Sequence, residues 1–330
     1  MPDPEPIPTA LRDAVLDWYR ASGRVLPFRA TDDPYAILVS EVMAQQTQIE
    51  RVAEAWTRFM ARFPTIRALA DAGPADVLRQ WRGMGYNRRA LNLHRLARRV
   101  VAEHGGAIPG DLAALAKLPG VGPYTARAVA ALAFGARVGA VDTNVRRVLG
   151  RVAGRPAGPA GRSDAATERA IQTLADAAVP PDAPGEWTHA LMDIGATLCR
   201  PRAPRCTDCP AAPWCRSALE DGAPARPVRS PADATAGRPP RATAGKPPRA
   251  TAGPPQRPAG SPPFEETTRW LRGRILDRLR DGEPSTWVRF GSEVGRHDAI
   301  AVRDALGSLA ADGLLERHPL DEELARLPLA

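Results

Sequence analysis

Four cysteines lie within 17 residues of this chain, in the order Cys199-x6-Cys206-x2-Cys209-x5-Cys215, and the sequence contains no other cysteine. Prolines between them make the backbone turn repeatedly, so that four thiolates can reach one inorganic centre. Zinc also accepts four thiolates, but its sites usually pair two Cys-x2-Cys hooks, and this segment has one. The spacing therefore favours one [4Fe–4S] cluster, in which each iron binds one cysteine, and leaves zinc as the alternative.

The composition is that of a helical protein. Of 330 residues, 44% are hydrophobic and only 5% aromatic, while alanine and arginine are abundant, which favours helices over strands. No apolar run approaches the roughly 18 residues that a membrane-spanning helix needs. The N-terminal residues lack the basic and apolar regions of a signal peptide. Together with thiolates that need reducing conditions, these features lead us to expect a protein of the cytoplasm.

The formal net charge of +8 is unevenly distributed along the chain. Residues 222–263 carry seven basic side chains and one acidic one, whereas 264–330 carry ten basic and thirteen acidic ones. The net charge of the remaining 221 residues is therefore only about +5. A balance of that size is ordinary for a large folded body, so charge alone is a weak indication of nucleic-acid binding.

Composition divides the chain into a first domain over 1–221, a linker over 222–263 and a small domain over 264–330. The linker contains twelve prolines and five glycines, and repeats an eight-residue unit that begins as ATAGRPPR at residue 234. Such a segment cannot build a core, and its proline pairs favour extended polyproline II. We predict a disordered spacer, whose basic side chains can hold phosphates loosely.

The first domain is predicted to be an all-α body of about ten helices. Apolar residues recur at helical spacing between glycine and proline breaks. We expect helices over 9–19, with Thr9 as its cap, over 34–59, over 76–81 and over 90–104. The small domain is predicted to contain helices over 267–280 and 297–311 and then a strand near 314–317, as in a winged-helix domain. Because its net charge opposes DNA binding, we expect it to pack against the chain or to bind a protein partner.

A tight turn lies between two predicted helices at 118–126, where the sequence reads LPGVGPYTA. Gly120 and Gly122 allow the backbone to bend without Cβ clashes, on either side of Val121. Free N–H groups at such a turn, and at the start of the helix that follows, can hold a phosphate without recognising a base. The segment closely resembles the helix-hairpin-helix element of DNA repair proteins.

Together with this turn, further motifs make the chain similar to the helix-hairpin-helix DNA glycosylases, in the branch of endonuclease III and the MutY-type adenine DNA glycosylases. The resemblance covers about residues 10–217. Its motifs are LPFR at 26–29, SEVMAQQTQ at 40–48, GMGYNRRALNLH at 83–94, VDTNVRRV at 141–148 and MDIGATLC at 192–199, followed by the cysteine segment. It implies two helical lobes and an iron–sulfur loop, and SEVM-x-QQTQ is typical of the adenine-specific members.

The resemblance implies catalytic roles for three residues. Glu41 stands at the position of the general acid that protonates the purine base, and Asp142 at that of the carboxylate that stabilises the positively charged sugar. On the sequence alone, Glu41 could instead be an acid on a helix surface and Asp142 a helix N-cap. Tyr124 occupies the position of the Schiff-base lysine of bifunctional relatives, so we expect an enzyme that releases the base without cutting the strand.

The resemblance also implies residues that hold DNA. Gln45 and Gln46 match the wedge that fills the gap left by a flipped base, and Tyr86 matches the tyrosine inserted beside the opposing base. Tyr86 could instead pack beneath the glycine-rich turn, and His189 could be an ordinary helix-face histidine. The implied DNA contacts are Gln45, Gln46, Tyr86, Gly120, Val121, Gly122 and Asn144. The implied base pocket is Arg24, Leu26, Arg29 and His189, and the implied cluster ligands are Cys199, Cys206, Cys209 and Cys215.

The chain departs from the family pattern at Phe28, Asn87 and Thr143, where the family commonly has tryptophan, a second tyrosine and glycine. The Nudix-like domain that reads 8-oxoguanine is replaced by the linker and the small domain. We therefore expect Tyr86, with Gln46, to recognise the opposing base, and the small domain to matter little for that discrimination.

The sequence-based hypothesis is a monomeric, nucleoid-associated bacterial enzyme of DNA base-excision repair. It would hydrolyse adenine from double-stranded DNA in which adenine is mispaired with 8-oxoguanine or guanine. One alternative is a monofunctional glycosylase for deaminated purines or for mismatched thymine or uracil. Another is a non-catalytic DNA-binding iron–sulfur protein, which the presence of both Glu41 and Asp142 argues against.

Overall fold

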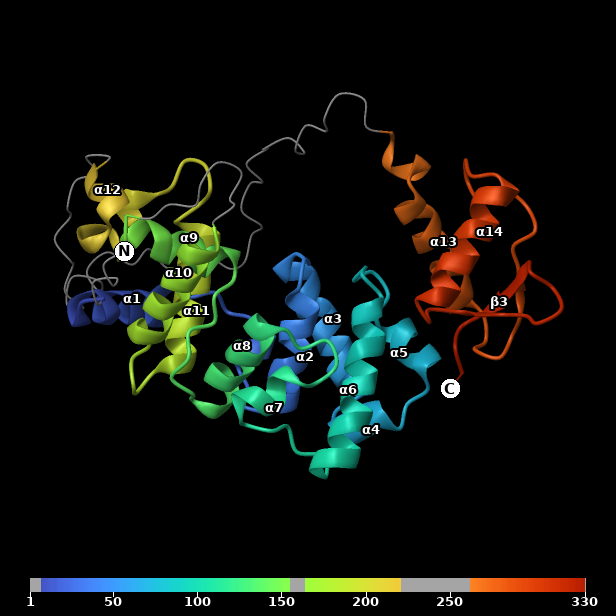
Figure 1. Cartoon of the computed structure of the whole chain (residues 1–330), viewed down its shortest axis with the longest axis horizontal. Coiled ribbons are helices and arrows are strands. Elements are labelled where there is room, and N and C mark those ends of the chain that lie inside the picture. The colour runs from blue at the N-terminus through green and yellow to red at the C-terminus, as the bar shows by residue number, and fades with distance from the viewer. Residues whose placement is uncertain (1–6, 155–163, 221–261, 330) are drawn as a thin grey trace, which may run out of the picture.

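The computed structural model describes residues 7–154, 164–220 and 262–329 (Figure 1). Helices dominate these ranges, as the sequence predicts, and three short strands lie near the C-terminus. The linker predicted over 222–263 lies outside the described residues, except for its last two prolines. Within the described ranges, no helix is both long and apolar enough to cross a membrane.

The middle of Figure 1 is occupied by a group of helices that we call the central lobe. Its elements are the short 3-10 helix η1 (Pro27–Arg29), α2 (Pro34–Ala44), α3 (Ile49–Arg62), α4 (Ile66–Ala70), α5 (Pro74–Gln80), α6 (Arg88–His104), α7 (Leu112–Ala116) and α8 (Pro123–Phe134). Edge-to-face ring contacts join Phe59 to Phe63 and to Trp81 in its core, and all three side chains are fully buried. Helix α2 is buried on nearly every side, so the central lobe is built around it.

The single helix predicted over 34–59 is wrong, because the chain breaks between α2 and α3. Gln46 adopts a left-handed backbone conformation with φ of 54°. Arg89 from α6 donates hydrogen bonds of 2.9 Å to the carbonyl oxygens of Val42 and Met43, and a further one to that of Gln45. These bonds satisfy carbonyl groups that the end of a helix leaves without partners, so a tertiary contact ends α2.

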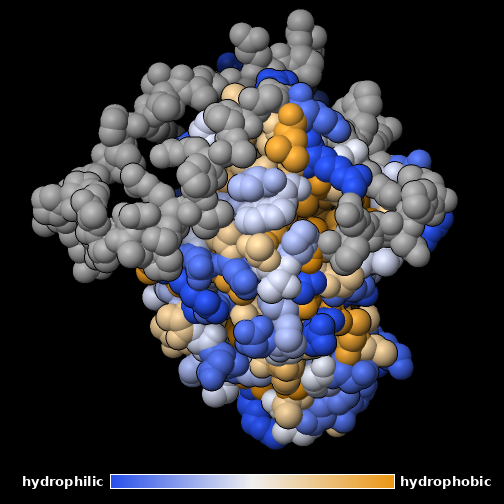
Figure 2. Space-filling view, turned by 90° about the vertical axis from the view of Figure 1, so that its left-hand side faces the viewer, coloured by the Kyte–Doolittle hydropathy of each residue, from blue (hydrophilic) through white to orange (hydrophobic). Residues whose placement is uncertain are grey.

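A second group of helices, on the left of Figure 1, forms what we call the cysteine lobe. It contains α1 (Thr9–Ser22), α9 (Thr143–Val152), α10 (Ala165–Ala178), α11 (Pro184–Thr197), and η3 (Cys206–Asp208), η4 (Ala212–Trp214) and α12 (Arg216–Glu220). Thr9 starts α1 rather than capping it, since Pro8 is the N-cap and makes no side-chain bond. On the face shown in Figure 2, pale and orange residues run down the middle, with hydrophilic residues on either side.

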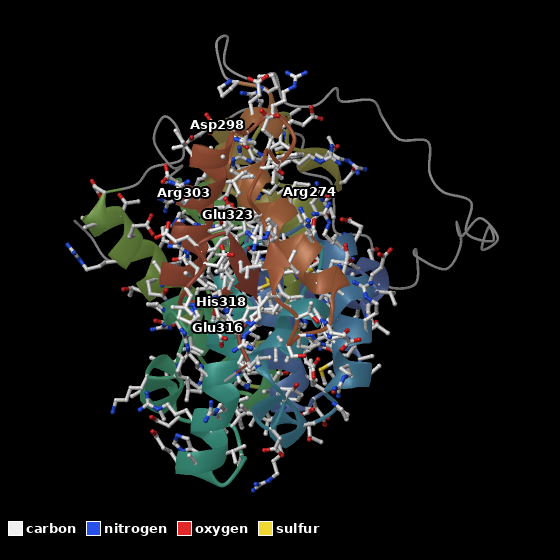
Figure 3. The ribbon with its side chains drawn as sticks, turned by 90° about the vertical axis from the view of Figure 1, so that its right-hand side faces the viewer. Arg274, Asp298, Arg303, Glu316, His318 and Glu323 are labelled. Carbon is white, nitrogen blue, oxygen red and sulfur yellow. The ribbon has the colours of Figure 1, made fainter. Side chains whose placement is uncertain are left out.

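The C-terminal module, residues 262–329, contains the two predicted helices and a three-stranded sheet, of which the sequence analysis predicted one strand. After the short η6 (Phe264–Glu266), its elements are α13 (Thr268–Asp281), β1 (Val288–Arg289), α14 (Ala299–Ala311), β2 (Glu316–Arg317) and β3 (Leu324–Arg326). The strands are antiparallel in the order β1-β3-β2, and Ala325 is paired with both Val288 and Arg317. Figure 3 views the molecule from the side of this module.

The module is packed against the central lobe. Leu271 and Leu276 of α13 belong to the same hydrophobic core as the central helices. Arg280, only 8% exposed, donates hydrogen bonds to the Leu78 carbonyl at 2.9 Å and to Asn87 Oδ1 at 2.7 Å. A buried guanidinium is costly unless its donors are satisfied, so these bonds fix how the module sits.

We expect Gly195→Ala to destabilise the protein by about 1–3 kcal/mol, because overpacking a tight contact forces the backbone to shift. Gly195 lies where α11 crosses α9, and a Cβ atom there would come within 2.5 Å of Asn144 Cβ. Gly307 of α14 is the control, since its Cβ would meet nothing within 4 Å. In denaturant unfolding, the free energy of unfolding of Gly307→Ala should equal or exceed that of the wild type. Equal stability of the two variants would contradict this account of the helix crossing.

A candidate active site between the two helical lobes

A cavity of about 820 Å³ lies where the central lobe meets the cysteine lobe. Helices α2 and α8 supply one wall, and α11 with the start of α9 supplies the other. The residues predicted from the sequence that line it are Arg24, Arg29, Glu41, Gln45, Gln46, Gly120, Gly122, Tyr124, Asp142, Asn144 and His189. Three of the predicted base-pocket and DNA-contact residues lie elsewhere: Leu26 packs on the hydrophobic core, Val121 is buried, and Tyr86 lines a neighbouring cleft.

Glu41 is a buried acid and not the helix-surface acid of the alternative interpretation. It is 8% exposed, and its Oε2 accepts a hydrogen bond of 2.9 Å from the Tyr124 hydroxyl. Burial, the largest effect, and the negative charge of Asp142 together raise the pKa of Glu41 to about 7, against the opposing effects of the Tyr124 hydrogen bond and the Arg29 charge. A carboxyl group with that pKa holds a proton in a large fraction of molecules at neutral pH.

Asp142 is the N-cap of α9, and it also lines the cavity. Its Oδ1 accepts a hydrogen bond of 2.7 Å from the Val145 amide, and its Oδ2 accepts one of 3.0 Å from Asn144 Nδ2. The N-cap interpretation is therefore correct, and it holds together with a place in the site. The cap fixes the carboxylate, and the partial positive charge of the helix N-terminus stabilises its negative charge.

Tyr124 lies in the first turn of α8, where it can act as a neutral hydrogen-bond donor. Burial raises its pKa well above the ordinary value, and the charges of Glu41 and Asp142 raise it further. Lys117, which is nearby in the sequence, ends α7 and is not among the residues that line the cavity. The side chain that α8 presents to the cavity at this position is therefore a phenol and not an amine.

Asp193, which sequence analysis did not select, organises the two arginines of the predicted base pocket. It is fully buried and forms a two-pronged pair with Arg29, with both distances 2.8 Å. The Arg24 backbone amide and Nε also donate to it, at 2.8 and 2.7 Å. Burial would raise the pKa of Asp193, but the bonds from Arg29 and Arg24 outweigh it and the pKa is lowered.

His189 of α11 lines the cavity, and its role in the base pocket stays a prediction. Burial and the nearby positive charge of Arg29 together lower its pKa to about 3. The imidazole is therefore neutral at physiological pH. A neutral imidazole has one nitrogen that donates and one that accepts, which suits the polar edge of a base.

The predicted hairpin is formed by α7 and α8. Gly120 has a φ of +77°, and a Cβ atom there would meet Asn92 Cβ at 2.9 Å, so glycine is required. Gly122 is the N-cap of α8, and Pro123 is its first residue. Both glycines line the cavity, and the N-terminus of α8 is therefore placed beside the acidic site.

The cysteine segment wraps one end of the cysteine lobe, and its four side chains are each half-buried. Burial and the other three thiols together raise the pKa of Cys209 to about 12, which indicates that all four lie within electrostatic reach of one another. Arg151 Nη1 lies 3.3 Å from Cys199 Sγ. Among the described residues, no three His, Cys, Asp or Glu side chains are arranged as ligands of a single metal ion.

Comparison with known proteins places this site in a family. Residues 39–176 match the model of the HhH-GPD superfamily of base excision DNA repair proteins. The adenine DNA glycosylase of Mycolicibacterium smegmatis is 39% identical over 306 residues, which is 92% of each chain. That of Mycobacterium tuberculosis is 41% identical over 324 residues, 95% of this chain and 94% of its own.

This chain belongs to the adenine DNA glycosylase family. Its resemblance to the larger human adenine DNA glycosylase is confined to 218 residues, at 42% identity, which is 63% of this chain and 39% of the human one. The similarity to the mycobacterial glycosylases covers 92% and 95% of this chain, so it extends beyond the two helical lobes into the C-terminal module.

Solved structures support the fold of this adenine DNA glycosylase. A thermostable thymine-DNA glycosylase is similar with a TM-score of 0.57 and 30% identity, over 63% of this chain and 95% of its own. An endonuclease III in a non-covalent DNA complex has a TM-score of 0.52 at 24% identity, over 64% of this chain and 94% of its own. The second likeness concerns the fold alone.

Proposed function

We propose that this glycosylase hydrolyses the N-glycosidic bond of adenine in double-stranded DNA, where adenine is mispaired with 8-oxoguanine or guanine. Family membership supports adenine as the base. The observation that carries the chemistry is the raised pKa of Glu41 in a cavity that also holds the Asp142 carboxylate. An acid and a carboxylate in one cavity suit departure of a base from a sugar.

In this proposal Glu41 is the general acid. Adenine is a poor leaving group as an anion, and a proton delivered to its ring nitrogen lets it depart as a neutral molecule. As the glycosidic bond breaks, the sugar becomes an oxocarbenium-like cation, which the Asp142 carboxylate stabilises. Water then completes the hydrolysis. Tyr124 holds the Glu41 carboxyl group through its hydroxyl.

The adenine must leave the helical stack to reach Glu41, and residues around the cavity suit that step. We assign the base pocket to Arg24, Leu26, Arg29 and His189, with Asp193 holding both arginines. Gln45 and Gln46 fill the vacated space, while Asn144 and the hairpin around Gly120, Val121 and Gly122 hold the DNA backbone. The fixed polar groups of the pocket favour one base over others.

We infer that the four cysteines hold one [4Fe–4S] cluster with a structural role. Their thiolates are the donor type that such a cluster requires. Arg147 ties the loop to the active site, because it donates to the Cys199 carbonyl at 2.6 Å and to Asn144 Oδ1 at 2.7 Å. The cluster would thereby fix the start of α9, where Asp142 lies.

The rate of adenine release should be constant below about pH 7 and fall roughly tenfold per pH unit above it, since only protonated Glu41 can act as the acid. If Glu41 had the ordinary pKa of about 4.3, the rate would begin to fall at a pH roughly three units lower.

Glu41→Gln should slow release by about 10²–10⁴-fold while duplex binding is retained. Single-turnover kinetics across pH measure both effects, and full activity of the variant would show that another group supplies the proton.

Tyr124→Lys should introduce some strand cleavage and a DNA adduct that borohydride traps, because an amine would then face the sugar. The wild type should give little trapped product, since its phenol cannot form a Schiff base. Gel analysis after borohydride treatment measures the adduct. Strong trapping by the wild type would overturn the monofunctional assignment.

Purified without oxygen, the protein should be brown and contain about four irons per chain, as one cubane requires. Cys209→Ser should lower the iron content and the thermal unfolding temperature together, because one thiolate ligand is lost. Iron analysis with visible absorbance tests this, and a colourless protein with one tightly bound zinc would refute it.

A further inference from the structure

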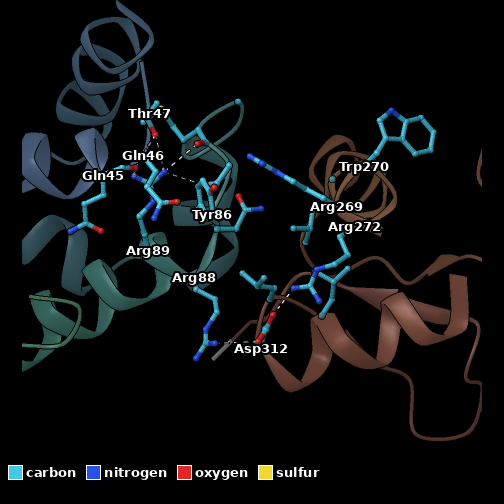
Figure 4. Close-up of a pocket in the computed structure, with 18 of the residues that line it drawn as sticks. Gln45, Gln46, Thr47, Tyr86, Arg88, Arg89, Arg269, Trp270, Arg272 and Asp312 are labelled. Carbon is cyan, nitrogen blue, oxygen red and sulfur yellow. Dashed lines mark hydrogen bonds and ion pairs between the residues drawn. The ribbon is translucent and has the colours of Figure 1, made fainter. Parts of the chain in front are cut away.

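A second cleft, of about 900 Å³, opens between the central lobe and the C-terminal module (Figure 4). Its central-lobe wall carries Gln46, Tyr86 and Arg89, and its module wall is the start of α13, with Arg269 and Arg272. In Figure 4, the Arg269 side chain reaches from α13 across the cleft toward Tyr86. The module is therefore part of the surface around the residue that was predicted to meet the opposing base.

The central-lobe wall is held in a strained form. Gln46 and Tyr86 have φ values of 54° and 44°, although neither is glycine. Arg89 joins their loops, since it donates to Thr47 Oγ1 at 3.0 Å and to the Gly85 carbonyl at 3.3 Å. Residues kept in such conformations by their surroundings cluster at ligand-binding sites, and these two line one cleft.

Tyr86 is presented to solvent between two guanidinium groups. It is 48% exposed, so it does not pack beneath the turn as an ordinary core aromatic would. The guanidinium carbons of Arg89 and Arg269 lie 5.6 and 5.0 Å from the centre of the Tyr86 ring. Arg272 is ion-paired with Asp312, whereas Arg269 meets no acidic partner among the residues that the structure describes. One exposed positive charge thus remains beside an exposed aromatic ring.

The module also holds the Tyr86 loop from beneath. Arg280 donates to Asn87 Oδ1, and Asn87 is one of the positions where this chain departs from the family pattern. The amide oxygen of Asn87 accepts a hydrogen bond from the buried Arg280 guanidinium. A tyrosine side chain at this position would displace that guanidinium. The departure at Asn87 and the docked module therefore fit each other.

A DNA strand is the occupant that this cleft suits. Gln45, Gln46 and Thr47 line both the cleft and the active-site cavity, so the two are joined across one loop. Because an adenine that enters the cavity leaves its partner nucleotide in the duplex nearby, the cleft on the other side of that loop is within reach of the partner nucleotide. An exposed guanidinium, an aromatic face and amide groups suit the phosphate, the ring and the polar edge of a nucleotide.

We propose that the C-terminal module forms part of the binding site for the strand opposite the excised adenine, and that Arg269 contacts the nucleotide facing that adenine. This inference rests on the proposed function. It replaces the sequence-based expectation that the central lobe alone recognises the opposing nucleotide and that the module serves a protein partner.

The test uses the full-length protein and a matched pair of arginine variants. Arg269 is exposed, so Arg269→Ala removes a charge at the cleft without opening the core. Arg303→Ala removes an equally exposed charge from α14 of the same module, and Arg303 does not line the cleft. Figure 3 shows Arg303 and the cleft-lining Arg274 on different sides of the module.

Binding is measured on duplexes that carry 2′-fluoro-2′-deoxyadenosine, whose glycosidic bond resists hydrolysis, opposite 8-oxoguanine. Arg269→Ala should weaken binding about tenfold, which is typical of losing a stacking or bidentate contact. Arg303→Ala should stay near wild type. Arg269→Lys should recover only part of the loss, because lysine keeps the charge but not the planar group. Equal affinities of Arg269→Ala and Arg303→Ala would overturn the proposal.

Photocrosslinking locates the strand directly. A duplex with 5-iodouracil next to the 8-oxoguanine should crosslink to α13 or the Tyr86 loop, whereas one with 5-iodouracil next to the adenine should not. Crosslinks to α13 from the adenine strand alone would overturn the proposal. Failure of the proposed function is a separate outcome, because wild-type protein would then release no adenine from either mispair, whatever Arg269 does.

Discussion

The proposed active site depends on a buried carboxyl group, Glu41, for which the described part of the chain provides no ion pair. Arg29 acts on Glu41 through its positive charge, but both of its terminal nitrogens are engaged by Asp193. Glu41 therefore receives a phenol hydrogen bond and a distant positive charge, neither of which offsets its burial. Burying an unpaired carboxylate is costly, so the group keeps its proton near neutral pH. This is the property that the proposed general acid requires.

The rest of the fold holds this acid in place and surrounds it with groups of fixed charge. Helix α2 carries Glu41 through the centre of one lobe, while α9 presents Asp142 from the other lobe at its N-terminus. The close crossing of α9 and α11 at Gly195 fixes how these two helices of the cysteine lobe pack, and both helices contribute residues to the cavity. Arg89 ends α2 and ties its last turn to the Tyr86 loop, which links the active-site cavity with the second cleft.

Sequence analysis identified the residues whose side-chain type the proposed reaction requires. Glu41, Tyr124 and Asp142 came from ordered motifs, and the structure brings them into one cavity. Arg89 and Asp193 were missed, although both lie inside quoted motifs, because their partners are carbonyl groups and arginines from distant segments. The break after α2 was missed for the same reason, since a tertiary hydrogen-bond donor decides it. The packing of the C-terminal module on the central lobe depends on the buried guanidinium of Arg280. The pattern of apolar residues along the chain gives no sign of such a contact.

The proposed mechanism requires Glu41 to hold a proton near neutral pH. Carbon-13 NMR of labelled glutamate carboxyl groups measures this protonation state most directly. The Glu41→Gln variant identifies the Glu41 signal by its disappearance. The account predicts that this signal titrates near pH 7, as burial beside Asp142 requires. Titration at roughly pH 4, the ordinary range of a glutamate, would contradict it.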